Sequence, residues 1–314
     1  MHENAIIQLA KKFPHFHPEV QLGIGDDTAI LGPLNQSSLL WTTDLLLEDV
    51  HFRRNYFSPE DLAWKALAVN LSDIAAMGGE PLAFTLGLGL PPEMDAAWIQ
   101  AFFKALQAAS EFWQVELVGG DTVRSSAKIV ISINLLGTAL HPTLQSGAQP
   151  GDNLFVSGSF GGAAAGLYCL ENNLEGYACL KEKLLRPQPQ LKAAQALSKI
   201  CNRLALTDAS DGLGRSLQLL CGPKLGCSIL LEKVPCLPEL KQLAEAENLS
   251  AWPWIIEGGE DYELVAALPP EQCAAAEKLG WIQIGSITPS PQIQIVSSDG
   301  SRHPLKETLG FQHF

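Results

Sequence analysis

Residues 58–81 read SPEDLAWKALAVNLSDIAAMGGEP and predict a long helix with both of its ends marked. Ser58 is a typical N-cap, Pro59 suits the first helical position, and Asp61 stands where a capping box places an acid. Two glycines and a proline at the end of the stretch stop the helix. The apolar residues that recur at helical spacing are Leu67, Leu71 and Ile74.

Shorter apolar segments on both sides of this helix predict strands that alternate with further helices. The predicted strands cover residues 28–31, 38–47, 83–90, 115–121, 128–140, 153–158, 227–234, 262–268, 281–288 and 292–298. The other predicted helices cover residues 93–113, 161–172, 189–202 and 211–221. In this pattern the GGD at 119–121 ends a strand and starts a turn. The alternation indicates an α/β or mixed α+β fold.

Turn-forming residues are concentrated at 141–153, in the stretch HPTLQSGAQPGDN. We place a domain boundary there, because 314 residues are enough for two domains of ordinary size. The predicted domains are 1–147 and 148–314.

The composition favours a folded protein that does not bind nucleic acid. Hydrophobic residues make up 46% and charged residues 18% of the chain, so a substantial core can form. The formal net charge of −13 argues against a general basic surface for nucleic acid. The same acidity suits a site that gathers metal cations.

The cysteines and the first residues favour a cytoplasmic protein. All seven cysteines lie between Cys169 and Cys273, their number is odd, and no CxxC occurs, so we expect reduced thiols. The start, MHENAIIQLAKKF, lacks an apolar stretch of signal-peptide length. No run approaches the roughly 18 apolar residues of a membrane span.

Several acids stand beside glycines or inside apolar segments. The motifs are GIGDD (23–27), TTDLLL (42–47), NLSDIAAMGG (70–79), VGGDT (118–122), LTDASDG (206–212) and GGEDYEL (258–264). Each one alone is explained by a turn, a helix cap or a buried hydrogen-bonded acid. Together they place acids at the ends of elements, where carboxylates hold hard cations such as Mg²⁺. Several Mg²⁺ ions on a polyphosphate would account for so many acids.

Other phosphate and nucleophile motifs are absent. The chain has no GxxxxGK[ST], no HRD and DFG pair, and no GxSxG elbow. The glycine-rich GSFGGAAAG at 158–166 follows a predicted strand. It is either a phosphate-binding loop or a tight turn from strand to helix.

The motifs as a set resemble the thiamine-monophosphate kinase family. GIGDDTAIL, TTDLLLEDVHF, KALAVNLSDIAAMGGEP, VGGDT, SGAQPGD, LTDASDGLG and GGEDYEL occur in that family's order, and the final GFQHF resembles its C-terminus. The resemblance implies the fold of aminoimidazole-ribonucleotide synthetase and selenophosphate synthetase, with N-terminal strands that pair in a homodimer and a C-terminal domain that closes over the nucleotide. It also implies Mg²⁺-dependent transfer of the γ-phosphoryl group of ATP to thiamine monophosphate.

The resemblance implies three sets of contacts. The positions that match metal ligands are Asp27, Thr42, Thr43, Asp44, Asp73, Asp121, Asp208 and Asp211, the threonines partly through backbone oxygen. Those that match ATP contacts are Gly120, Asp121, Gln145 and Ser210. Those that match contacts to the thiamine substrate are His51, Glu260 and Leu309, with Phe311 close to the last.

Phosphoryl transfer between two phosphates requires that their charges be neutralised. A site made of aspartates repels ATP unless cations bind first, so we interpret the acids as cation ligands. Two positions depart from the family. Gln145 replaces an arginine that contacts phosphate, and Leu309 replaces an aromatic residue that stacks on thiamine. Arg124 and Phe311 are our candidate substitutes.

Two alternatives remain open. One is another ATP-using enzyme of the same fold, although selenophosphate synthetases have a reactive N-terminal cysteine and hydrogenase-maturation relatives end in cysteine. This chain has no cysteine before Cys169 and ends in Phe314. The other is a catalytically impaired protein that binds metal or thiamine phosphate.

Overall fold

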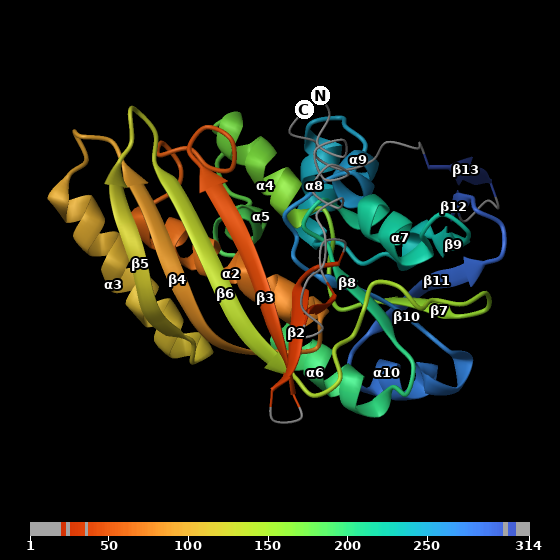
Figure 1. Cartoon of the computed structure of the whole chain (residues 1–314). Coiled ribbons are helices and arrows are strands. Elements are labelled where there is room, and N and C mark those ends of the chain that lie inside the picture. The colour runs from red at the N-terminus through yellow and green to blue at the C-terminus, as the bar shows by residue number, and fades with distance from the viewer. Residues whose placement is uncertain (1–19, 23–25, 35–36, 298–300, 306–314) are drawn as a thin grey trace.

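The computed structural model describes residues 20–22, 26–34, 37–297 and 301–305. They form two mixed sheets with helices packed around and between them, so the predicted α/β or α+β class is confirmed (Figure 1). No helix in these ranges is long and apolar enough to cross a membrane. All seven cysteines are described, and each is a free thiol.

The first sheet has the strand order β1-β2-β3-β6-β4-β5. Only the pair β4–β5 is parallel. Its strands are β1 (Val20–Leu22), β2 (Ala29–Leu34), β3 (Ser37–Leu47), β4 (Glu80–Leu90), β5 (Glu116–Arg124) and β6 (Val130–Ala139). Helices α2 (Pro59–Ala76) and α3 (Ala96–Trp113) lie on one face of this sheet, behind it in Figure 1.

The second sheet has the order β13-β12-β9-β11-β7-β10-β8. Its strands are β7 (Asn153–Val156), β8 (Ala205–Asp208), β9 (Gly226–Leu230), β10 (Leu264–Leu268), β11 (Ile282–Thr288), β12 (Ile293–Val296) and β13 (Arg302–Pro304). The helices of this half are α4 (Gly162–Glu171), α5 (Ala178–Leu185), α6 (Leu191–Ile200), α7 (Leu213–Cys221), α8 (Pro238–Ala246), α9 (Trp252–Ile256) and α10 (Cys273–Lys278). Short 3₁₀ turns η1 (Leu231–Lys233) and η2 (Pro270–Gln272) complete it.

Helix α2 has the ends that its sequence predicts. The Ser58 hydroxyl accepts the backbone N–H of Asp61 at 3.0 Å and donates to the Asp61 carboxylate at 2.8 Å. Gly78 follows the helix with φ of +66°, a left-handed conformation that glycine adopts without strain. The cap and the glycine together fix where this helix begins and ends.

Helix α2 packs on both sheets. Leu67 and Leu71 belong to the core cluster that contains Leu40 and Phe84 of the first sheet. The last turn, with Ala75 and Ala76, belongs to a different cluster, which it shares with second-sheet residues. Those second-sheet residues are Phe155, Leu206, Leu264, Ala266 and Leu268. The helix is therefore buried on nearly all sides, as an apolar helix between two layers should be.

Two local expectations were wrong. The GGD at 119–121 lies inside β5, because β5 continues to Arg124. A Cβ on Gly120 would come within 2.1 Å of the Leu86 carbonyl oxygen, so this glycine allows close pairing with β4. The strand expected over 227–234 ends at Leu230 and turns into η1. The sequence patterns also missed α5, α8, α9, α10, β1, β8 and β13, which are short.

The cap of α2 gives a test of the fold. We expect Ser58→Ala to lower the free energy of unfolding by about 1 kcal/mol, because the Asp61 N–H loses its acceptor. Thermal and urea unfolding measure this change. Ser126→Ala, at an exposed residue of the turn between β5 and β6, is the control and should leave the melting temperature unchanged. Equal effects of the two changes would contradict the assigned cap.

Candidate active site

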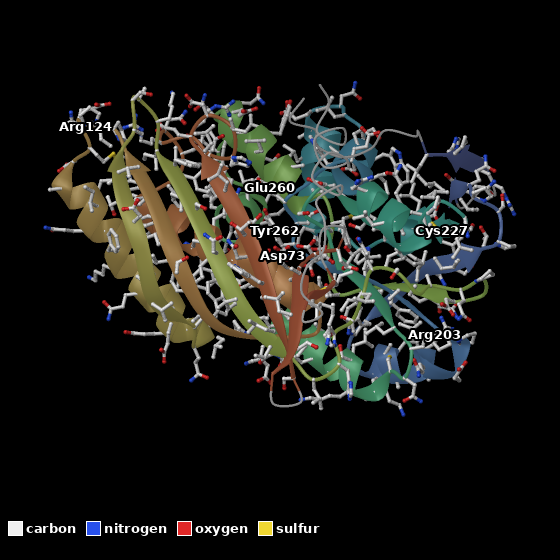
Figure 2. The ribbon with its side chains drawn as sticks, viewed as in Figure 1. Asp73, Arg124, Arg203, Cys227, Glu260 and Tyr262 are labelled. Carbon is white, nitrogen blue, oxygen red and sulfur yellow. The ribbon has the colours of Figure 1, made fainter. Side chains whose placement is uncertain are left out.

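Three aspartates from distant parts of the chain meet where the two halves of the molecule join. Asp27 precedes β2, Asp73 lies on α2, and Asp208 ends β8. One carboxylate oxygen from each lies within 4.8 Å of the other two. Figure 2 places Asp73 in the middle of the molecule, at this junction. The structure therefore brings together three of the predicted metal ligands.

Hydroxyl groups hold two of these carboxylates from one side. Thr42 of β3 donates to Asp73 Oδ2. Ser72 donates to Asp208 Oδ2 at 2.5 Å. Each bond uses one oxygen and restricts the rotation of its carboxylate, which leaves the other oxygen for a ligand.

Asp27 has an oxygen without a protein partner. Its Oδ1 accepts a hydrogen bond from Thr207 at 3.3 Å. Its Oδ2 is buried and has no hydrogen-bond partner among the described residues. Buried polar atoms are almost always paired, so an oxygen in this state suits an ion as its partner. The three carboxylates therefore fit a bound divalent cation in both type and arrangement.

The acids also raise one another's pKa. Burial raises the pKa of Asp27 well above its ordinary value, and the charges of Asp208 and Asp26 add to this rise. Burial and the charges of Asp44, Asp208 and Asp27 do the same for Asp73. Burial raises the pKa of Asp208 to about 7. Carboxylates that repel one another in this way gain most when positive charge binds between them.

Asp44 links this acid cluster to a neighbouring pocket. Its backbone N–H donates to Asn70 Oδ1 at 3.1 Å, which ties β3 to α2. Burial and the nearby Asp211 charge raise the pKa of Asp44 to about 6. Both Asp44 and Asp211 line the pocket, while their charges act on Asp208 in the cluster. The pocket and the cluster therefore form one continuous site.

The pocket has a volume of about 490 Å³ and combines acidic with apolar walls. It contains five of the predicted site residues, which are Asp44, His51, Ser210, Asp211 and Glu260. Its apolar lining includes Leu46, Phe57, Val69, Leu167, Leu184 and Tyr262. Arg53 and Glu171, also in the lining, form an ion pair of 2.5 Å. This lining suits a flat, positively charged organic group.

His51 and Glu260 are both fixed by the backbone around them. The ring nitrogen Nδ1 of His51 accepts the Leu47 N–H at 3.0 Å, so a neutral His51 carries its proton on Nε2. Glu260 has φ of +67°, and its N–H donates to the Ser210 carbonyl at 2.6 Å. Figure 2 shows Glu260 and Tyr262 close to Asp73 in the centre of the molecule.

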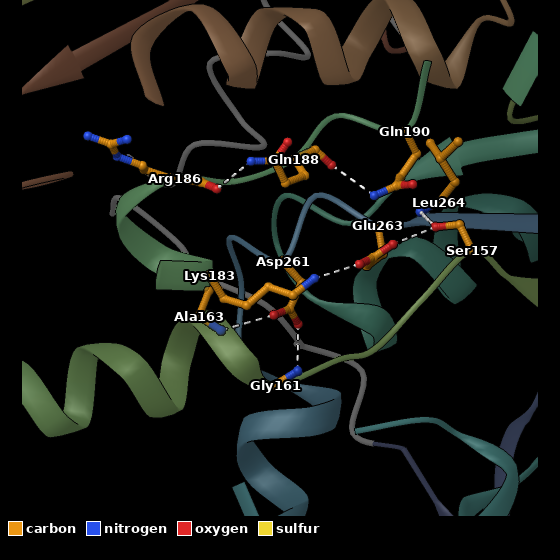
Figure 3. A network of polar contacts seen from close by, with 10 residues as sticks. All are labelled: Ser157, Gly161, Ala163, Lys183, Arg186, Gln188, Gln190, Asp261, Glu263 and Leu264. Atoms are coloured by element: carbon orange, nitrogen blue, oxygen red, sulfur yellow. Dashed lines mark hydrogen bonds and ion pairs between the residues drawn. The ribbon is translucent and has the colours of Figure 1, made fainter. Parts of the chain in front are cut away.

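The segment GGEDYEL uses its next acids for structure. Asp261 accepts the N–H groups of Gly161 at 2.6 Å and Ala163 at 3.1 Å, at the start of α4 (Figure 3). Glu263 pairs with Lys183 at 2.8 Å and accepts the Ser157 hydroxyl at 2.7 Å. Two N–H groups of the glycine-rich turn, those of Gly161 and Ala163, are thus occupied by Asp261. Of the two interpretations of that turn, the structure favours the strand-to-helix turn over the phosphate loop.

Four predicted residues do not join this site within one chain. Asp121 and Gly120 lie on the edge strand β5, three strands from β3. Across the sheet, Asp121 of β5 pairs with Gly87 of β4, Gly87 pairs with Ser132 of β6, and Ser132 pairs with Leu45 of β3. Paired residues lie on the same face, so Asp121 and Leu45 share one face of the sheet, here called the outer face. Thr43 also points to that face, whereas Thr42 is buried on the other. Arg124 lies at the far end of β5, well away from Asp73 in Figure 2.

Gln145 lies at the edge of the acid cluster. Its backbone N–H donates to Asp26 Oδ2 at 3.2 Å, and Asp26 Oδ1 accepts the Asp27 N–H at 3.0 Å. Asp26 therefore connects the segment between the sheets to a cluster ligand and is a positioning group.

The two predicted thiamine contacts near the C-terminus, Leu309 and Phe311, lie outside the described residues.

Comparison with known proteins identifies the family. Residues 25–139 match the family described as AIR synthase related protein, N-terminal domain. The thiamine-monophosphate kinase of Bacillus subtilis (strain 168) is 32% identical to this chain, in an alignment that covers 95% of each chain. The chain belongs to the thiamine-monophosphate kinase family. The family's protein from Escherichia coli (strain K12) is 38% identical over 257 residues, covering 80% of this chain and 77% of that one.

A solved structure of the family, AaThiL complexed with AMPPCP and TMP, has the same fold. It is 34% identical, with a TM-score of 0.87, and the match covers 100% of this chain and 97% of that chain. Thiamine-monophosphate kinases are phosphotransferases, so membership sets aside the alternative of another enzyme type on this fold.

The sequence patterns missed two residues of the site. Tyr262 lies in the pocket and has a pKa well above its ordinary value, owing to burial and the charges of Glu260 and Asp44. Lys65 is completely buried behind Glu260. A lysine within the apolar run AWKALAV was the available signal, since a charge is rarely found in such a run without a partner.

The raised pKa values give a test of the acid cluster. Asp208 has a pKa of about 7 when folded and about 3.9 when unfolded, so its ionisation destabilises the fold as the pH rises between these values. Without metal, we expect Asp208→Asn to be more stable than the parent protein above about pH 7, by roughly 1 to 4 kcal/mol. The two should converge near about pH 4. Thermal unfolding with EDTA at several pH values measures the difference.

Added Mg²⁺ should then raise the melting temperature of the parent protein more than that of Asp208→Asn. Glu175→Gln removes one charge from an exposed residue and serves as the control. If the melting temperatures of the parent and of Asp208→Asn depended on pH in the same way, burial and repulsion among the carboxylates would not raise the pKa of Asp208 as described.

Proposed function

We propose that this protein transfers the γ-phosphoryl group of ATP directly to the phosphate of thiamine monophosphate, which gives thiamine diphosphate and ADP. The observation that carries the proposal is the acid cluster that opens into an acidic, partly apolar pocket. Family membership and the likeness to a relative in complex with AMPPCP and TMP support the same reaction. This reaction completes the synthesis of thiamine diphosphate.

The pocket suits the organic part of thiamine monophosphate. Thiamine contains a cationic thiazolium ring and an aminopyrimidine ring. Phe57 and Tyr262 offer aromatic surface, and Glu260 offers a carboxylate that can accept hydrogen bonds and balance a positive charge. The substrate phosphate would then lie toward Asp44 and Asp211, on the side of the pocket next to the acid cluster.

The acid cluster would hold several Mg²⁺ ions. Asp27, Asp73 and Asp208 would be ligands, with Asp44 and Asp211 on the pocket side. Bound Mg²⁺ supplies the positive charge that lets two phosphates approach each other. The protein's own contribution is to hold these carboxylates in place through Thr42, Ser72 and Thr207 and to orient the substrate.

The transfer needs no protein nucleophile. The acceptor is already an ionised phosphate oxygen, so no side chain has to remove a proton from it. In-line attack on the γ-phosphorus requires only that the acceptor and the ATP be aligned. We therefore assign the side chains of this site to binding and alignment, without a phosphoenzyme.

A chromatographic assay tests the proposed reaction. The purified protein, incubated with ATP, magnesium chloride and thiamine monophosphate, should form thiamine diphosphate and ADP in equal amounts. We expect Asp44→Asn to lower kcat/KM by about 100-fold or more, since it removes a charged ligand from the site. Glu175→Gln should keep full activity. Folded protein that leaves thiamine monophosphate intact would contradict the proposal and would favour a binding protein instead.

We also propose that the chain forms a homodimer through the outer face of the first sheet. Apolar residues on this face are exposed in the single chain, among them Trp41 (50%), Leu45 (53%) and Val123 (56%). An exposed apolar surface next to an open strand edge favours association. A second copy also offers a way to bring Asp121, roughly 14 Å across the sheet from Leu45, to a site that its own chain does not reach. The predicted domain 1–147 would then form the dimer, and the predicted domain 148–314 would close over the nucleotide.

Sedimentation measures the dimer directly. The parent protein should sediment at twice the mass of one chain. Leu45→Glu combined with Val123→Glu should shift it to the mass of one chain, because each dimer would bury four new charges. Leu249→Glu, at an exposed leucine of the second half, should remain dimeric. A parent protein that sediments as a single chain would contradict this proposal.

A further inference from the structure

Lys65 carries a charge in the interior of the protein. Its side chain is 0% exposed, on helix α2. Its Nζ lies 2.8 Å from Oε1 and 2.9 Å from Oε2 of Glu260, so one ammonium group contacts both carboxylate oxygens. The Nζ also lies 5.0 Å from the centre of the Phe57 ring, in a cation–π contact. A buried ammonium is tolerated only with such partners.

Lys65 itself does not line the substrate pocket, but both of its partners do. Glu260 and Phe57 belong to the pocket wall, and the Glu260 side chain is 28% exposed. Lys65 therefore lies behind the wall and acts on the pocket only through Glu260. Since Lys65 comes from α2 and Glu260 from the segment before β10, this ion pair also connects the two halves of the chain.

Glu260 has a second attachment at its backbone. Its left-handed conformation and the hydrogen bond of its N–H to the Ser210 carbonyl fix where the side chain starts. The ion pair with Lys65 fixes where the side chain ends. A carboxylate held at both ends presents its oxygens in one direction.

This direction matters because other carboxylates lie nearby. Glu260 lines the same pocket as Asp44 and Asp211, which are two of the predicted cation ligands. The carboxylates of aspartate and of glutamate both bind divalent cations. A Glu260 that could rotate freely would be able to join the cation ligands and leave the organic part of the pocket without its acceptor.

We propose that Lys65 is a positioning residue that holds Glu260 as an acceptor for the thiamine part of the substrate and keeps it out of the cation-binding set. This inference rests on the proposed function. Lys65 would divide the carboxylates of one site into two groups, one that binds cations and one that binds the organic cation of the substrate.

The test uses Lys65→Met, which removes the charge and keeps an unbranched side chain. We expect the KM for thiamine monophosphate to rise by about 10- to 100-fold, while the KM for ATP changes by less than about twofold. The Mg²⁺ concentration for half-maximal activity should also shift, because the released Glu260 can bind cations. Lys104→Met, at an exposed lysine of α3, should leave all three values unchanged.

The double variant Lys65→Met/Glu260→Gln separates positioning from a general loss of structure. It removes both charges of the pair, so it should fold, and its Mg²⁺ requirement should return to that of the parent. Its KM for thiamine monophosphate should match that of Glu260→Gln alone, since the two residues act as a unit. Additive effects, or an equal rise in the KM for ATP, would overturn the inference.

Calorimetric binding of thiamine monophosphate to the parent protein distinguishes the two ways of failing. If the parent neither binds nor converts thiamine monophosphate, the proposed function fails and this inference fails with it. If the parent does both, and Lys65→Met keeps the parent's KM and Mg²⁺ requirement, only the inference about Lys65 is overturned.

Discussion

The structure depends on keeping several carboxylates close together inside a protein that carries a net charge of −13. Carboxylate oxygens of Asp27, Asp73 and Asp208 come within 4.8 Å of one another, and Asp208 is buried while Asp27 and Asp73 are half-buried. Their mutual repulsion opposes folding, so other contacts must hold the three segments in place. Hydroxyl groups next to the acids, the buried helix α2 and the shared core supply those contacts. The unfavourable charge is concentrated where a cation would relieve it.

The two halves of the chain contribute different parts of the site. The first half supplies Asp27, Asp44 and Asp73, which lie on or beside its sheet and on α2. The second half supplies Asp208, Asp211 and the segment that carries Glu260 and Tyr262. Neither half contains the whole site, and the ion pair between Lys65 and Glu260 crosses the junction. A shift of one half against the other would therefore change both the acid cluster and the pocket.

Local patterns in the sequence predicted the long elements well and the meeting of distant residues poorly. The caps and spacing of α2 are local, so its bounds could be predicted from the sequence. The acid motifs predicted a shared cation site, but which aspartates converge could not be predicted from them, because the convergence of Asp27, Asp73 and Asp208 depends on strand order. The glycines of VGGDT were interpreted as a turn, whereas Gly120 allows close strand pairing instead. Lys65 was missed because a helical pattern treats a lysine as solvent-exposed.

The position of α2 has a consequence for how the chain folds during synthesis. This helix is made early, yet part of its surface packs against Leu206, Leu264 and Leu268, which the ribosome adds much later. Until then the last turn of α2 has no apolar neighbour from the second sheet. The first half therefore leaves the ribosome with an uncovered apolar surface, a state in which chains are prone to bind each other or a chaperone. Translation speed between the two sheets would set how long that state lasts.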